Sequence, residues 1–249
     1  MTQSLAVAGP TVLAANAALL GAADPGLSPA RKLKVVCVGG HPDDPESGCA
    51  GTLARYAEDG HAVTIIYLTR GERGIEGKSN DEAAQIRSAE CEAACKVVGA
   101  RALFAGQIDG SSEVNKTRID EMKSLLAAEN PDVVFAHWPI DTHVDHQVAS
   151  FLTIRGCMAL GPKARLYFFE VNSGSQTQGF FPDSYVDITG ALEKKKGALL
   201  AHASQDGEAI WRKHHEVIAK WRGREAGVSM AEAFVHLNRE AQSAMLPGL

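Results

Sequence analysis

The chain has 249 residues, with 25 lysines and arginines against 30 aspartates and glutamates, and a formal net charge of −5. Proteins that bind nucleic acids in general or anionic membranes need an excess of clustered cations, because these displace counterions from phosphates. That balance excludes both classes, and the length suits one large α/β domain with a substantial core.

The first thirty residues differ in composition from the rest. Ser4 to Ala23 contains no charge and is rich in alanine, leucine and valine, and a turn-rich linker follows it. The stretch has the length and small-residue content of a secretory signal, although it lacks a positively charged start; a membrane anchor or an apolar arm on the domain are the alternatives. We predict an N-terminal segment over 1–30, a single domain over 31–249, and export to the periplasm or beyond ahead of a cytoplasmic location.

Strands and helices alternate through the domain. Lys34 to Val38 is too short for a helix and too continuously apolar for a half-exposed strand, which predicts a strand buried on both faces. Apolar residues at helical spacing follow, and Gly60 marks the end of that helix. We predict strands over 34–38, 63–68, 102–104, 132–136, 165–169 and near 184–187, and helices over 46–59, 81–98, 114–129, about 146–160, 190–201 and 208–224.

This order of elements predicts an α/β fold: a doubly wound, mostly parallel, Rossmann-like sheet of strand order 3-2-1-4-5 with helices on both faces. In that order the first and fourth strands are neighbours. The crevice between their carboxyl ends is the point where such sheets bind ligands.

Two loops rich in histidine and aspartate leave these neighbouring strands. His41-Pro-Asp-Asp44 follows the first strand and His143-Val-Asp-His146 follows the fourth strand, after a short connection. One such loop alone is more often a turn with a capping aspartate. Two that face each other supply the nitrogen and oxygen ligands of zinc, and three protein ligands with one open position make a catalytic site. No GxSxG, GxGxxG or P-loop motif offers another chemistry.

With these motifs the chain resembles the PIG-L/LmbE-like zinc-dependent N-deacetylases, whose signatures are a His-Pro-Asp-Asp segment after the first strand and a His-x-Asp-His segment after a later one. The likeness extends over most of residues 33–206, including Arg87-Ser-Ala-Glu90 and Ala201-His-Ala-Ser-Gln205. Pro45 is a departure, because it moves the first glutamate to position 46. The resemblance implies a hydrolase that removes an acetyl group from an N-acetylglucosamine-type amino sugar or its conjugate.

The resemblance also implies roles for single residues. One Zn²⁺, or another divalent metal, is held by His41, Asp44 and His146. The reaction is carried by Asp43 as general base, by His143 as the donor to the oxyanion, and by Asp145, which orients the ring of His143. Candidates to hold sugar hydroxyls are Arg70, Glu72 and Arg73. His137 and His202 are left without a role.

The expected partner is a small amino-sugar substrate, with no nucleic acid and no integral membrane span in the mature domain; a monomer and a homo-oligomer both stay open. Two other functions stay open as well. A metal-dependent amidase acting on another acyl-amine or a thiol conjugate would use the same metal chemistry. A noncatalytic carbohydrate- or zinc-binding module would not need Asp43, and the presence of that carboxylate therefore argues against it.

Overall fold

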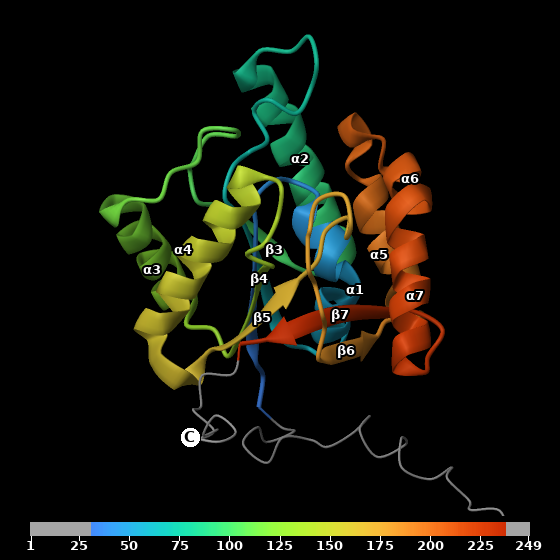
Figure 1. The fold of residues 1–249 in the computed structure, drawn as a ribbon. Helices are drawn as coiled ribbons and strands as arrows, with labels where there is room; N and C mark the ends of the chain where they lie inside the picture. Colours follow the sequence, from blue (N-terminus) through green and yellow to red (C-terminus); the bar gives the residue numbers. More distant parts are fainter. Residues whose placement is uncertain (1–30, 238–249) are drawn as a thin grey trace, which may run out of the picture. The chain divides into compact units, whose positions relative to one another are not determined.

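The computed structural model describes residues 31–237. The predicted N-terminal segment, residues 1–30, lies outside the described residues. Figure 1 shows the strands β1 (Lys34–Gly39), β2 (Ala62–Tyr67), β3 (Arg101–Phe104), β4 (Val133–His137), β5 (Arg165–Phe169), β6 (Ser184–Asp187) and β7 (Ala231–His236). The helices are α1 (Asp44–Glu58), α2 (Asn80–Val98), α3 (Lys116–Glu129), α4 (Val144–Leu160), α5 (Leu192–Leu200), α6 (Gly207–Ile210) and α7 (Glu216–Ala226).

In the described part of the chain, seven strands form one sheet of order β3-β2-β1-β4-β5-β7-β6. The first five pair in parallel, which confirms the predicted doubly wound fold and the order 3-2-1-4-5. β7 pairs antiparallel with β5 and with β6. The sequence did not predict β7, because its Glu232 is buried whereas a charged residue is normally read as exposed.

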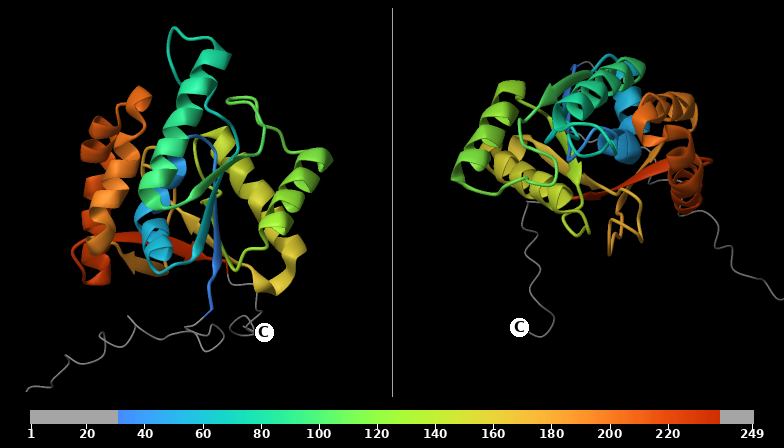
Figure 2. Two further views of the ribbon diagram at one scale, coloured as in Figure 1. Left: turned by 180° about the vertical axis from the view of Figure 1, so that it is seen from behind. Right: turned by 90° about the horizontal axis from the view of Figure 1, so that it is seen from above.

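Helices cover both faces of the sheet, with α3 and α4 on one side and α1, α2 and the C-terminal helices on the other (Figures 1 and 2). Alternate residues of β1 pack against the helices on opposite faces of the sheet. Val36 and Val38 belong to the core shared with α3 and α4, while Cys37 faces Cys49 of α1, with 3.3 Å between the two Sγ atoms. The prediction that this strand is buried on both faces is confirmed.

The C-terminal helices depart from the predicted ranges. The helix expected over 190–201 is α5 preceded by a 3-10 turn, Thr189–Ala191. The helix expected over 208–224 consists of α6, a π-helical stretch Trp211–His215 and α7. Within residues 31–237, none of the helices combines the length and the apolar character needed to cross a bilayer.

Gly48 lets α1 lie close to β5. A Cβ added there would lie 2.2 Å from Cδ2 of Phe169, a ring with no exposed surface. Gly48→Ala is therefore expected to destabilise the fold by about 1–3 kcal/mol, because rigid neighbours must shift. Urea denaturation measures the change. Gly190→Ala is the control, since an added Cβ meets nothing within 4 Å there; equal stabilities for the two variants would contradict the prediction.

Candidate metal centre

The loop after β1 runs close to the loop after β4. The amide of Gly40 donates to Nε2 of His137 at 3.0 Å. A Cβ at Gly40 would lie 3.0 Å from Cδ2 of His146 and 3.1 Å from Oδ2 of Asp44. The two polar loops thus meet at the predicted edge of the sheet, and a glycine at position 40 permits the approach.

Asp43 adopts a left-handed backbone conformation, which residues other than glycine and asparagine rarely adopt. Its φ is 103°, and it is the N-cap residue of α1. The guanidinium of Arg87, a buried residue of α2, donates to the carbonyl of Pro42 and, at 3.1 Å, to Oδ2 of Asp43. Strained backbone of this kind persists where surrounding contacts hold it. Sequence reasoning missed Arg87, although its segment belongs to the family-like stretches.

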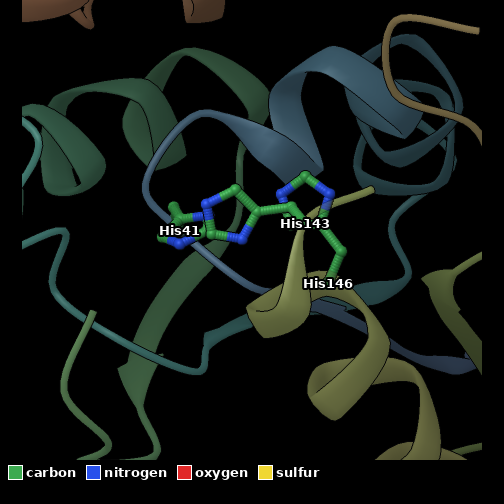
Figure 3. A group of neighbouring side chains, drawn as sticks. All are labelled: His41, His143 and His146. Carbon is green, nitrogen blue, oxygen red and sulfur yellow. The ribbon is translucent and has the colours of Figure 1, made fainter. Parts of the chain in front are cut away.

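The three predicted ligands lie together. Oδ2 of Asp44 is 3.1 Å from Nδ1 of His41 and 3.2 Å from Nε2 of His146. Figure 3 shows the rings of His41 and His146 beside that of His143. Donor atoms of these three histidines lie within 4.8 Å of one another, as do those of Asp44, His137 and His146. Imidazole nitrogens gathered around one carboxylate oxygen are a donor set that fits Zn²⁺.

The charges of this cluster are mutually dependent. Burial raises the pKa of Asp44, but His146 and His137 outweigh it and hold that pKa well below its usual range. Burial lowers the pKa of His146, but the carboxylate of Asp44 outweighs it and raises that pKa to about 9. The carboxylate is thus stabilised by positive charge beside it, which a divalent cation also supplies. Because ligating imidazoles must be neutral, metal binding would release protons.

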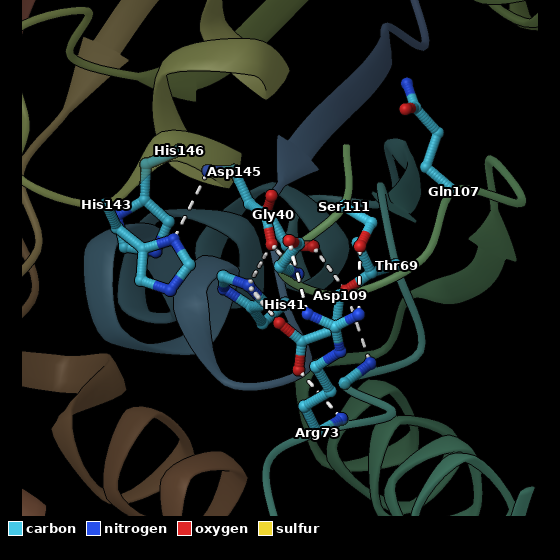
Figure 4. Close-up of polar contacts among 12 residues, drawn as sticks. Gly40, His41, Thr69, Arg73, Gln107, Asp109, Ser111, His143, Asp145 and His146 are labelled. Atoms are coloured by element: carbon cyan, nitrogen blue, oxygen red, sulfur yellow. Dashed lines mark hydrogen bonds and ion pairs between the residues drawn. The ribbon is translucent and has the colours of Figure 1, made fainter. Parts of the chain in front are cut away.

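Asp145 was expected to orient the ring of His143, but in the structure its carboxylate contacts His41. Oδ2 of Asp145 lies 3.0 Å from Nε2 of His41 and accepts a hydrogen bond from the amide of Gly110 at 2.7 Å. Figure 4 shows this side chain turned toward His41. Position 145 is the second residue of α4, and the helix geometry directs its carboxylate toward the first loop. Asp145 therefore fixes a predicted metal ligand, as second-sphere carboxylates do.

His143 is oriented by the main chain instead. The backbone amide of Asp145 donates to Nδ1 of His143 at 3.2 Å, which makes this histidine the N-cap of α4. Since Nδ1 accepts, the proton of the neutral ring lies on Nε2. His143 is half-buried and lines the cavity, and the Nε2–H is a donor available for substrate.

Asp141 is a further residue that sequence reasoning missed. Its Oδ1 lies 3.1 Å from Nδ1 of His146, and its Oδ2 accepts from the hydroxyl of Thr177 at 3.0 Å. This carboxylate is buried, and its contact with Nδ1 fixes the orientation of the His146 ring. The signal was its place two residues before the His-x-Asp-His segment.

Asp141→Asn is expected to raise the dissociation constant for zinc roughly tenfold to a hundredfold, because the carboxylate that orients His146 and increases its basicity is lost. Competition with a chelating dye measures the constant. The matched control is Asp120→Asn, at a carboxylate on the surface of α3 that pairs with Lys116 and Lys123. An unchanged zinc affinity in Asp141→Asn would count against this role.

A cavity of about 450 Å³ opens over the cluster. Of the three predicted substrate-binding residues, Arg73 lines this cavity, whereas Arg70 and Glu72 do not. Glu72 is buried and accepts the amide of Asp109 at 3.2 Å, so it supports the loop rather than contacting a ligand.

Asp109, which the sequence did not single out, lines the cavity, and its Oδ1 lies 3.3 Å from Nε2 of His41. The remaining lining residues are His41, Asp43, Asp44, Ser47, Gly74, Arg87, His143, His146, Val171, Asn172, Gln176, Gln205 and Ile210.

The two histidines without an assigned role are both buried. His137 stacks on His146, with ring centroids 4.1 Å apart, and accepts the amide of Gly40. Nε2 of His202 lies 3.4 Å from Oε2 of Glu46. Neither lines the cavity. His137 belongs to one of the possible metal-donor groups, whereas His202 contacts α1.

Fold and site together define a doubly wound α/β protein with a candidate metal centre at its switch point. The family model described as GlcNAc-PI de-N-acetylase, PIG-L, matches residues 36–157. Diacetylchitobiose deacetylase of Thermococcus kodakarensis is 30% identical over 217 residues, which cover 80% of this chain and 81% of that protein. The chain belongs to the PIG-L family of deacetylases.

Two further relatives show the breadth of this family. The structure of N,N'-diacetylchitobiose deacetylase from Pyrococcus horikoshii, in complex with an inhibitor, superimposes with a TM-score of 0.72 at 27% identity and covers 82% of this chain and 84% of that one. 4-oxalmesaconate hydratase of Pseudomonas putida is 26% identical over 75% of this chain and 80% of that protein. Family membership therefore defines the scaffold, while the reaction has to be argued from the site.

Proposed function

We propose that the protein is a zinc-dependent hydrolase that removes the acetyl group from the nitrogen of an N-acetylglucosamine-type amino sugar or its conjugate. The observation that carries the proposal is the position of Asp43. Its carboxylate lines the cavity directly beside the donor set, while Arg87, rather than a predicted ligand, holds one of its oxygens. A site that only binds a cation does not require such a carboxylate.

The residues His41, Asp44 and His146 would hold the metal. Zinc held there would lower the pKa of a water molecule to about 7 and would polarise the amide carbonyl. Asp43 takes the proton of the attacking water and returns it to the departing amine, the two tasks of a general base that becomes a general acid. Burial raises the pKa of Asp43 to about 6, against the opposing charge of Arg87.

His143 stabilises the negative charge that develops on the amide oxygen by donating a hydrogen bond to it. Nε2 carries the proton of the neutral ring, because Nδ1 accepts the amide of Asp145. A donor fixed before the reaction starts needs no reorganisation in the transition state, and removing one such donor typically costs roughly a hundredfold or more in rate.

The rest of the cavity suits a small polar ligand. Its volume lies in the range of ordinary small-molecule sites. Arg73, Asn172 and Gln176 line its wall and offer donors and acceptors for sugar hydroxyls. The names of the relatives support an acetylated amino sugar, since one is a diacetylchitobiose deacetylase and another, 27% identical over 175 residues, is a 1D-myo-inositol 2-acetamido-2-deoxy-alpha-D-glucopyranoside deacetylase.

The test is acetate release by zinc-reconstituted protein from N-acetylglucosamine, diacetylchitobiose, and inositol and lipid glycosides of N-acetylglucosamine. Amides with longer acyl groups and thiol conjugates are included to detect the amidase alternative. We expect turnover of at least one acetylated sugar. Zinc-loaded protein that cleaves only the non-sugar amides, or none of the compounds, would refute the proposed function.

A further inference from the structure

A buried ion pair lies against the N-terminal half of α1. Nζ of Lys195, on α5, lies 2.6 Å from Oε1 of Glu232, on β7. Exposure is 2% for Lys195 and 5% for Glu232. Both residues lie beyond residues 36–157, the part of the chain that the family model matches.

The pair is bonded to the backbone of α1. Lys195 donates to the carbonyl oxygens of Ser47 at 2.6 Å and Glu46 at 3.3 Å. Glu232 accepts the amides of Gly51 at 3.0 Å and Thr52 at 2.7 Å. The three protons of the ammonium therefore have three acceptors, and both carboxylate oxygens have donors.

The carbonyls of Glu46 and Ser47 belong to the first turn of α1, which begins at the metal cluster, and the amides of Gly51 and Thr52 follow in the same helix. Asp44 is the first residue of α1, and the amide of Ser47 donates to the carbonyl of Asp43 at 2.8 Å. Ser47 also lines the cavity of the candidate site. One residue thus connects the turn that carries the general base and a ligand with the buried ammonium of Lys195.

Helix stability alone does not explain the pair. The carbonyl of Ser47 and the amide of Gly51 lie four positions apart, so an ordinary helix pairs each with the other. Burying two charges is costly, and well-packed apolar side chains often stabilise a fold equally well. Metal ligands, by contrast, must be held within about 0.5 Å of their productive geometry.

We propose that Lys195 and Glu232 are positioning residues, which fix the first turn of α1 so that Asp43 and Asp44 meet the ligands from α4 in the geometry that binds zinc and acts on the substrate. The pair acts through Ser47 and touches neither metal nor substrate. The inference rests on the proposed function for the identity of the ion and the reaction.

The test compares zinc affinity and stability in Lys195→Met, Glu232→Gln and the double variant Lys195→Met/Glu232→Met. Zinc binding is measured by competition with a chelating dye in the absence of substrate, and stability by thermal denaturation of the metal-free protein. Lys194→Met is the matched control, because this neighbour on α5 pairs with Glu58 at the surface, with side chains 41% and 46% exposed.

We expect Lys195→Met to raise the dissociation constant for zinc roughly tenfold to a hundredfold, as loss of supporting contacts around a metal does. The double variant should recover the melting temperature lost in Lys195→Met, because it leaves no unpaired buried charge behind, yet its zinc affinity and its kcat per bound zinc should stay low. Lys194→Met should bind zinc within twofold of the unaltered protein.

A double variant that binds zinc as the unaltered protein does would overturn the proposal and leave the pair a purely structural role. If Lys195→Met does not fold, Glu232→Gln, which keeps the size of the side chain, is used in its place. A zinc affinity equal to that of the unaltered protein in Glu232→Gln would then overturn the proposal. Because zinc affinity is read without substrate, a failure to release acetate from any sugar contradicts the proposed function and leaves this test intact.

Discussion

Asp43→Asn is expected to lower kcat by roughly a hundredfold to ten-thousandfold, the usual contribution of a general base, while the protein keeps about one zinc per chain. The amide cannot take a proton from water, but it has the size of the carboxylate and tolerates the left-handed φ of 103° at this position. Asp43→Ala should lose activity as well, with some added backbone strain because alanine disfavours that conformation.

The measurement pairs steady-state deacetylation with metal analysis on the same preparation. Asp59→Asn is the control, since Asp59 is exposed and caps the opposite end of α1; its activity should be unchanged. Normal turnover by Asp43→Asn would exclude Asp43 as the base. Loss of zinc together with activity would instead assign Asp43 to metal binding.

His146→Ala is expected to abolish stoichiometric zinc binding and, with it, activity. Nε2 of His146 lies 3.2 Å from Oδ2 of Asp44, and loss of this ring leaves two of the three proposed ligands. A catalytic zinc site holds its ion with three protein ligands, so two should not retain it against a chelator. Metal content after dialysis against a mild chelator measures the effect.

The control for this variant is His214→Ala, a partly exposed histidine between α6 and α7 that does not line the cavity. That variant should retain about one zinc. Retention of zinc by His146→Ala after the same dialysis would contradict the proposed ligand set. Retention of activity without zinc would contradict the proposed mechanism.

The wider consequence of the proposal is that both halves of the chain support the candidate metal centre. Asp141 and Asp145 lie within the signature segments or beside them and contact the predicted ligands directly. Lys195 and Glu232 come from the C-terminal part, where they pair with each other and bond to the backbone of α1. The irregular C-terminal part, with its antiparallel strand β7, is thereby connected to the site through α1.

The sequence by itself determined the arrangement of the parallel strands and the place of the site. Buried parallel strands are read from short apolar runs, and their order brings the carboxyl ends of β1 and β4 to one edge. That was sufficient to predict that the loop with His41 and Asp44 would face the loop with His143 and His146. The assignment of zinc, of the general base and of the acetyl sugar depended on family resemblance, and it stays a proposal.

Only the tertiary structure decided which side chains touch. The carboxylate of Asp145 contacts His41 rather than His143, because the direction of a side chain at a helix start depends on how that helix docks. Lys195 meets Ser47 across 148 positions, and Glu232 is buried against the rule for charged residues. Periodicity records which face of an element is apolar, but a buried polar contact depends on two distant segments at once, and neither one alone carries its signal.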